Sequence, residues 1–284
     1  MKKYNKPPLT LQEQLNHIKE YYKIACKNDN LAFFYLKHHN YYRLRGYWLY
    51  FEKKGLKATF EDVINLYDFD NELRLLFSKY LQTIEISIKS NFAYTLAIKY
   101  DNPHIILDDT IFKNKEYYQS GIEKLKQNFN DSDEIFAIHY KKTYEEPLPP
   151  IWVSVELMTF GELSKWIYNL NDKDTKLIAK EYGIKSAHIF KSFLYHLTEI
   201  RNKCAHHSRI WNKSFSHKFV IPRKYKECFD NDTYKLSHTL LVMKLLLDKI
   251  NKNNIVNEVI ELANNYKISL NEMGLNETTL KALQ

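Results

Sequence analysis

Residues 59–100, TFEDVINLYDFDNELRLLFSKYLQTIEISIKSNFAYTLAIKY, decide the fold class of this chain. Thr59 followed by Asp62 is typical of the reciprocal cap that starts a helix, and Asp101-Asn-Pro103 ends the pattern. Between these signals, apolar side chains recur at the three- and four-residue spacing of a helix face, which predicts one long helix to about Tyr100. They are Val63, Leu66, Leu73, Phe77, Leu81, Ile84 and Ile88.

Helical patterns continue on both sides of this stretch. Thr10 and Glu13 form a second capping box, and the apolar spacing predicts a helix from Leu11 to about Ala25. Gly183 is the expected C-terminal cap of one later helix. The other helices are expected at about 31–37, 114–129, 132–144, 151–170, 174–182, 187–208, 232–251 and 254–266. Only residues 215–221 have the pattern of a strand, so the predicted fold class is all-α.

Pro147-Leu-Pro-Pro150 is the clearest break in these helical patterns. It predicts a boundary between an N-terminal helical region, 1–146, and a second helical region, 147–284. A chain of 284 residues can bury its core as one large domain or as two modest ones.

Composition excludes several classes of protein. The chain has only 6 Gly, none spaced for a phosphate-binding loop, which excludes P-loop and dinucleotide-binding proteins. Its 3 Cys are too few for a disulfide framework, which favours a reducing compartment. The first residues lack the apolar segment of a signal peptide, and no later segment is long enough to span a bilayer. We therefore expect a cytoplasmic protein without a membrane partner, and its net charge of +8 mildly favours a polyanionic partner.

The segment from Leu197 to Asn212, LTEIRNKCAHHSRIWN, carries the densest set of chemically useful side chains. At about 100° per residue, Asn202 and His206 lie on one stripe of a helix with Glu199, so Asn202 can orient His206. Arg201 and His206 lie about 140° apart around the same helix. One helix alone would not bring them tightly together, whereas two packed copies could, and this geometry favours a composite site.

Histidine and arginine together suit cleavage of RNA. An imidazole can take the proton of a 2′-hydroxyl group, or give one to the departing 5′-oxygen. A guanidinium group can bind the phosphate and stabilise the extra negative charge of the transition state. No metal or other cofactor is needed when the nucleophile is the 2′-hydroxyl of the substrate itself. The expected products are a 2′,3′-cyclic phosphate and a 5′-hydroxyl end.

Arg201-Asn-Lys-Cys-Ala-His206 resembles the Arg-x4-His motif of HEPN-type ribonucleases. Together with four other segments in the same order, it makes the chain similar to the bacterial Abi-like (AbiD/AbiF) abortive-infection family over about residues 7–215. The four segments are residues 40–48 (NYYRLRGYW), 84–88 (IEISI), 149–153 (PPIWV) and 159–166 (TFGELSKW).

The resemblance implies a multi-helical HEPN-like bundle with additional N-terminal helices, and RNA cleavage or binding in defence against phage. It assigns Arg201 and His206 as catalytic residues and Asn202 as the polar residue after the arginine. HEPN nucleases generally act as dimers whose motifs face each other, so one motif per chain implies a homodimer. An antitoxin that restrains the nuclease, either RNA or protein, is also expected.

Simpler interpretations compete with each of these. Cys204, His206 and His207 could suggest a metal, but adjacent helical residues diverge and no ligand pair has zinc spacing, so no metal site is expected. Glu85 and Lys89 most simply form an ion pair on a helix surface, and so do Glu199 and Lys203.

Further contacts to RNA are expected outside the catalytic residues. His207 and Arg209 are candidates for phosphate contact, and Tyr42, Arg43 and Arg45 for contact with phosphates and bases. Tyrosine and tryptophan at this density more often pack one helix on another, and that alternative is equally strong.

The predicted function is therefore a metal-independent endoribonuclease in abortive infection or in a toxin–antitoxin pair. The first alternative is a helical module that binds RNA without cutting it. The second is a protein-interaction scaffold that uses the leucine-rich C-terminal helix.

Overall fold

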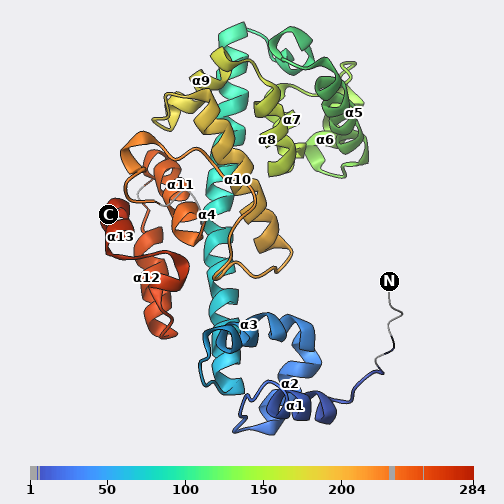
Figure 1. The fold of residues 1–284 in the computed structure, drawn as a ribbon. Helices are drawn as coiled ribbons and strands as arrows, with labels where there is room; N and C mark the ends of the chain where they lie inside the picture. Colours follow the sequence, from blue (N-terminus) through green and yellow to red (C-terminus); the bar gives the residue numbers. More distant parts are fainter. Residues whose placement is uncertain (1–4, 6, 230–233, 252) are drawn as a thin grey trace. The chain divides into compact units, whose positions relative to one another are not determined.

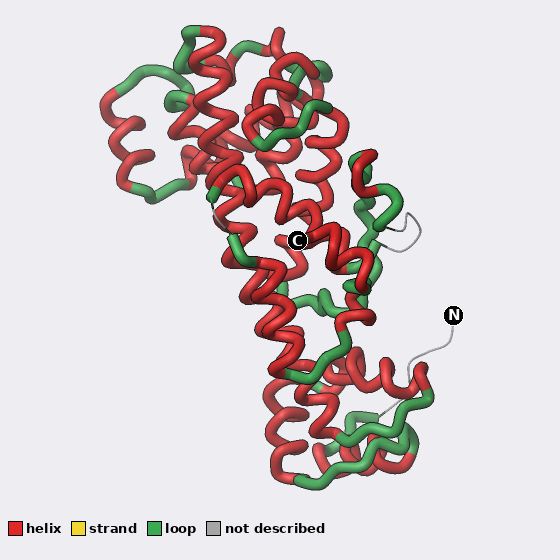
Figure 2. The backbone as a smooth tube through the Cα atoms, turned by 90° about the vertical axis from the view of Figure 1, so that its left-hand side faces the viewer, coloured by secondary structure: helices red, strands yellow, loops and turns green. Residues whose placement is uncertain are grey.

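The computed structural model describes residues 5, 7–229, 234–251 and 253–284, and this part of the chain is built from α-helices joined by loops and short 3-10 turns, without a strand (Figures 1 and 2). The predicted all-α class is confirmed. The helices are α1 (Leu11–Glu20), α2 (Asp29–His39), α3 (Tyr41–Lys54), α4 (Phe60–Tyr100), α5 (Lys115–Asp131), α6 (Ile135–Thr143), α7 (Ile151–Ser154), α8 (Phe160–Asn169), α9 (Asp172–Glu181), α10 (Ala187–Ala205), α11 (Leu236–Ile250), α12 (Ile255–Asn265) and α13 (Glu277–Leu283).

Contacts divide the chain into two compact units. The first unit comprises Met1–Arg74 and Ile260–Ser269, and the second comprises Leu75–Val259 and Leu270–Gln284. Helices α4 and α12 therefore contribute residues to both units. This division differs from the boundary between 146 and 147, which stays a prediction about independently folding regions.

The long helix predicted from the opening stretch is α4, with 41 residues. Its capping box is present: the Thr59 backbone N–H donates to Asp62 Oδ2 at 2.7 Å, and the Asp62 N–H donates to Thr59 Oγ1 at 3.3 Å. All seven apolar residues that define the predicted face are buried. The position, length and buried face of α4 are thus confirmed.

Helix α1 begins with the predicted cap but ends earlier than expected. Thr10 and Glu13 form the reciprocal hydrogen bonds, yet the helix stops at Glu20 rather than near Ala25. Lys23 takes a left-handed conformation with φ of 56°, which a continuing right-handed helix cannot accommodate. The chain then extends, and the Ala25 carbonyl accepts a hydrogen bond from the Phe60 N–H at 2.7 Å.

The prediction of one continuous helix at 151–170 is wrong, because the segment is divided into two helices. The structure has α7 and a 3-10 turn there, and a new helix, α8, starts at Phe160. Thr159 caps α8 with Glu162 in a reciprocal box, and an N-cap residue needs non-helical backbone angles. The cap therefore interrupts the apolar pattern that suggested one helix.

The strand predicted at 215–221 is also wrong. Phe215, Phe219 and Ile221 are buried in alternation, as a strand would require, but the segment is a loop. Its backbone does not pair with a neighbouring strand. The Val220 N–H, for example, donates to the Ser192 hydroxyl oxygen at 3.0 Å. Period-two burial here comes from an extended loop that packs its apolar side chains inward.

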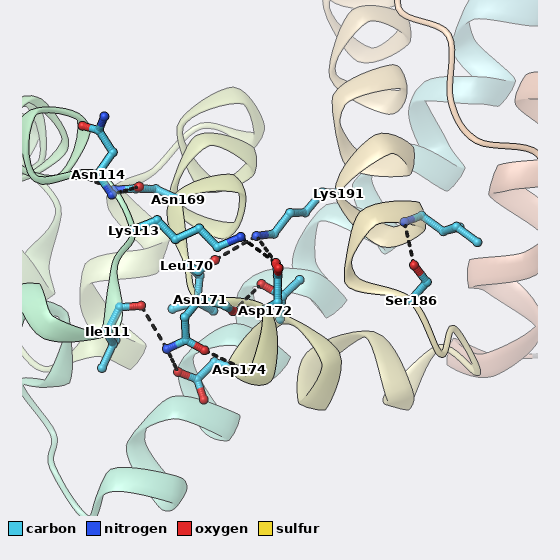
Figure 3. A network of polar contacts seen from close by, with 12 residues as sticks. Ile111, Lys113, Asn114, Asn169, Leu170, Asn171, Asp172, Asp174, Ser186 and Lys191 are labelled. Atoms are coloured by element: carbon cyan, nitrogen blue, oxygen red, sulfur yellow. Dashed lines mark hydrogen bonds and ion pairs between the residues drawn. The ribbon is translucent and has the colours of Figure 1, made fainter.

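A polar network holds the start of α9 against α10 (Figure 3). Lys113 and Lys191 both donate to the Asp172 carboxylate, at 2.7 and 3.1 Å, and Lys191 also donates to the Leu170 carbonyl at 2.8 Å. Burial lowers the pKa of Lys191, although its bond to Asp172 opposes the shift. The network fastens the loop between α8 and α9 to α10, the helix that carries the Arg201 motif.

His196 makes the second unit sensitive to acid. Its ring is fully buried, with Nδ1 2.6 Å from the His217 carbonyl oxygen and Nε2 3.0 Å from Thr239 Oγ1. Burial lowers the pKa of His196 to about 4, with a small additional lowering by His238, while the His217 carbonyl and Glu199 oppose the shift.

The folded protein therefore prefers neutral His196. Its stabilising contribution is complete above the unfolded pKa near 6.5 and is lost as the pH falls toward 4, by about 3 kcal/mol. We expect urea unfolding of the wild type to show this loss and the His196→Gln variant to show a shallower pH dependence over the same range. An equal slope in both proteins would contradict the assignment to His196.

Candidate active site at the end of helix α10

The Arg201 motif occupies the last turn of α10, which packs against α8, α9 and α11. The Ser186 hydroxyl caps the start of this helix by accepting from the Ile189 N–H. The buried face follows helical spacing and fixes the rotation of the helix about its axis. Its apolar members are Ala187, Phe190, Phe193, Leu194, Leu197, Ile200 and Cys204.

Helix α10 ends at Ala205, earlier than the predicted end at 208, and His206 is its C-cap residue. His207 follows with φ of 54°, its N–H donates to the Cys204 carbonyl, and the Ser208 N–H donates to the Lys203 carbonyl at 2.8 Å. These two bonds are the Schellman motif, which ends a helix with a left-handed residue. The motif histidine therefore lies at the helix end rather than on a continuing helical stripe.

Arg201 is paired with a glutamate from α4. Arg201 Nε lies 3.7 Å from Glu85 Oε2, and Lys89 Nζ lies 3.9 Å from Glu85 Oε1. The side chains of Glu85 and Lys89 are 16% and 11% exposed, while that of Arg201 is 35% exposed. Two cations thus share one carboxylate, so the cluster keeps one excess positive charge, and Arg201 is its member with the most solvent contact.

The contact between Glu85 and Arg201 is the feature that sequence reasoning missed. The four-residue spacing of Glu85 and Lys89 predicts their pairing, and the structure confirms it. Nothing in the local sequence of either helix indicates that Glu85 also meets Arg201, because that contact depends on how α4 and α10 pack.

His206 is exposed, and within the described part of the chain its ring makes no hydrogen bond. Its backbone N–H donates to the Asn202 carbonyl at 2.9 Å, which anchors the residue but leaves the imidazole open to a ligand. The Asn202 side-chain oxygen accepts from Arg201 Nη1 at 3.4 Å. Asn202 thus contacts the arginine of the motif, and its orienting effect on His206 stays a prediction.

Glu199 holds the loop that follows the motif. Its carboxylate accepts from the backbone N–H groups of Ser216 and His217, at 3.3 and 2.8 Å, and lies 3.4 Å from Lys203 Nζ. Burial favours a higher pKa for Glu199, but the two backbone donors and Lys203 lower it overall. The predicted Glu199–Lys203 pair is confirmed, and the main partners of Glu199 are in this loop.

The remaining candidates for RNA contact fall into two groups. His207 is exposed and Arg209 half-buried beside the motif. Tyr42, Arg43 and Arg45 lie on α3 in the first unit, where Tyr42 is 64% exposed and Arg45 donates to the Tyr22 hydroxyl at 3.1 Å. Their contacts to RNA stay predictions.

The described residues contain no group of three or more His, Cys, Asp or Glu side chains arranged to hold a metal ion. No described helix combines the length and the apolar character needed to cross a membrane.

Comparison with known proteins identifies the family. Residues 34–212 match the family described as Abi-like protein, a stretch that includes Glu85, Lys89, Arg201 and His206. No curated protein and no solved structure matched the chain. Because the match covers well over half of the 284 residues, it confirms the resemblance of the sequence to the Abi-like family. The chain belongs to the Abi-like family.

Proposed function

We propose that this chain is a metal-independent endoribonuclease of the HEPN type that acts in abortive infection or as the toxin of a toxin–antitoxin pair. Membership of the Abi-like family supports the role in abortive infection. The observation that carries the catalytic proposal is the open His206 ring at the end of α10, one turn beyond Arg201 and its positively charged cluster.

In the proposed reaction, the 2′-hydroxyl group of the RNA attacks the adjacent phosphorus and the bond to the 5′-oxygen breaks. His206 acts as acid or base, taking the 2′ proton or protonating the departing oxygen. Arg201 donates to the phosphate oxygens, where negative charge increases in the transition state. Glu85 positions the guanidinium group, and Asn202 is the proposed orienting residue.

The proposed active form is a homodimer. Within one chain Arg201 turns toward Glu85 on α4, whereas His206 is exposed at the helix end. Two copies that face each other at this end of α10 would place a second Arg201 and a second His206 around one phosphate. His207 and Arg209 would contact neighbouring phosphates, and an RNA or protein antitoxin would restrain the dimer.

The test is incubation of the wild type and the His206→Ala variant with labelled structured RNAs in excess chelator, followed by mapping of the product ends. We expect cleavage by the wild type alone, with 2′,3′-cyclic phosphate and 5′-hydroxyl ends. RNA binding by both proteins, with cleavage by neither, would favour the non-catalytic RNA-binding module. Cleavage that needs a divalent metal would contradict the proposed chemistry.

A further inference from the structure

The second unit contains an aromatic pocket of about 300 Å³, formed where the chain beyond α4 meets α5, α6 and the connection to α7. Helices α5, α6 and α7 lie together beside α8 in Figure 1. Four rings line the pocket: Phe129 of α5, Tyr140 and Tyr144 in α6 and at its C-cap, and Trp152 of α7. Its volume suits a ligand the size of a single base or nucleoside, at the lower end of small-molecule sites.

Two of the four rings, Tyr144 and Trp152, are open to solvent. Tyr140 and Tyr144 have ring centroids 4.9 Å apart with planes inclined by 31°. Tyr144 and Trp152 are 51% and 50% exposed, although large aromatic side chains gain most when they are buried. Such exposed rings are the surfaces on which unpaired bases stack.

The frame of the pocket is held in place before any ligand binds. Lys141 Nζ donates to the carbonyls of Asn130 and Ser132, which fixes α6 to the end of α5. The Ile151 N–H donates to the Pro103 carbonyl at 2.8 Å, which ties α7 to the segment after α4. A preformed pocket loses less conformational entropy when it binds a ligand.

His104 and Glu146 line the pocket beside its rings, and the Glu146 carboxylate gives the pocket a preference among the bases. His104 lines it, and the buried Nδ1 atom of His104 has no hydrogen-bond partner among the described residues. Glu146 also lines it with an exposed side chain. An ionised carboxylate only accepts hydrogen bonds, and guanine presents two adjacent donor groups, N1–H and the 2-amino group, on its pairing edge.

We propose that this pocket binds an unpaired guanine of the RNA, which deepens and rests on the proposed ribonuclease function. The Glu146 carboxylate repels phosphate, so the backbone of the RNA stays outside while the base enters. A cationic side chain of a protein would also suit aromatic rings and a carboxylate. The net charge of +8 favours the polyanion over a cationic partner.

The test is titration of the full-length wild type with the four nucleoside 5′-monophosphates, followed by tryptophan fluorescence. Trp152 is the reporter, because Trp48, Trp166 and Trp211 are buried. We expect saturable quenching with GMP and weaker binding of AMP, CMP and UMP. Glu146→Gln should weaken GMP binding by about tenfold or more, since glutamine keeps one acceptor oxygen but loses the charge and replaces the second acceptor by a donor. Glu145→Gln is the matched control, because this exposed neighbour does not line the pocket.

Several results would overturn the proposal. These are the absence of saturable GMP binding at millimolar concentration, equal affinity for all four nucleotides, or unchanged GMP affinity in Glu146→Gln. Tighter binding of N-acetylarginine amide than of GMP would assign the pocket to a cationic side chain instead. The GMP titration measures binding without cleavage, so its result does not depend on the result of the nuclease assay. GMP binding without ribonuclease activity would contradict only the proposed function.

Discussion

The Arg201→Ala variant is expected to cleave RNA about 10²–10³-fold more slowly than the wild type, because it loses a donor to the transition-state phosphate. Arg201 is the most exposed cation of its cluster and lies one turn before His206. Single-turnover rates with the protein in excess over RNA measure this loss, since saturation removes the effect of weaker binding. Arg201→Lys should recover part of the rate, because lysine keeps the positive charge but cannot form the bidentate hydrogen bonds of a guanidinium group.

Lys176→Ala is the matched control for the loss of one positive charge, because Lys176 is an exposed residue of α9 outside the cluster. It should reduce RNA affinity slightly and leave the saturated rate unchanged. Equal rate losses in Arg201→Ala and Lys176→Ala would contradict a specific role of Arg201 and point to net charge alone.

Glu85→Gln provides a second control for the same interaction. If Glu85 acts by holding Arg201, its substitution should alter the saturated rate in the wild type and have little effect in the Arg201→Ala background. This coupling follows because residues in one network give non-additive effects in a double-mutant cycle. Additive effects would mean that Glu85 influences cleavage by another route.

Local sequence predicted most of the helices, because caps and apolar spacing act within a few residues. The capping boxes at Thr10 and Thr59 and the left-handed Gly183 after α9 were all predicted. Helix α3 was missed, because tyrosine and tryptophan residues on several of its sides obscure the apolar stripe. Its start depends on Asn40, which has a φ of 66° and whose side-chain oxygen caps the helix by accepting from the Tyr42 N–H.

In the candidate site, too, the sequence predicts only what depends on neighbouring residues. Arg201 and His206 stand out by residue type and by spacing within one segment. Glu85 does not stand out in the sequence, because its contact with Arg201 depends on the packing of α4 against α10. The helix end at His206 was missed for a different reason: His207, unlike glycine, gives no strong signal for a left-handed position.

Asp70→Ala is expected to destabilise the first unit by about 3–5 kcal/mol, because it leaves a buried arginine without its carboxylate. Asp70 is fully buried and Arg74 is 3% exposed. Arg74 Nη1 lies 2.5 Å from Asp70 Oδ2, and the Tyr47 hydroxyl donates to the same oxygen at 2.7 Å. Urea unfolding followed by circular dichroism measures the loss, and Glu72→Ala, an exposed change on the same helix, should remain within about 0.5 kcal/mol of the wild type.

The double variant Asp70→Leu with Arg74→Met separates the two contributions to this loss. If most of it comes from the guanidinium group that has lost its carboxylate, removing both charges should recover a large part of the stability, since apolar side chains of similar size often replace a buried ion pair at little cost. Tyr47 would still lose its acceptor, so about 1–3 kcal/mol should remain. A double variant no more stable than Asp70→Ala would instead assign the loss to the hydrogen bond that Asp70 accepts from Tyr47, and the ion pair with Arg74 would then contribute little to the first unit.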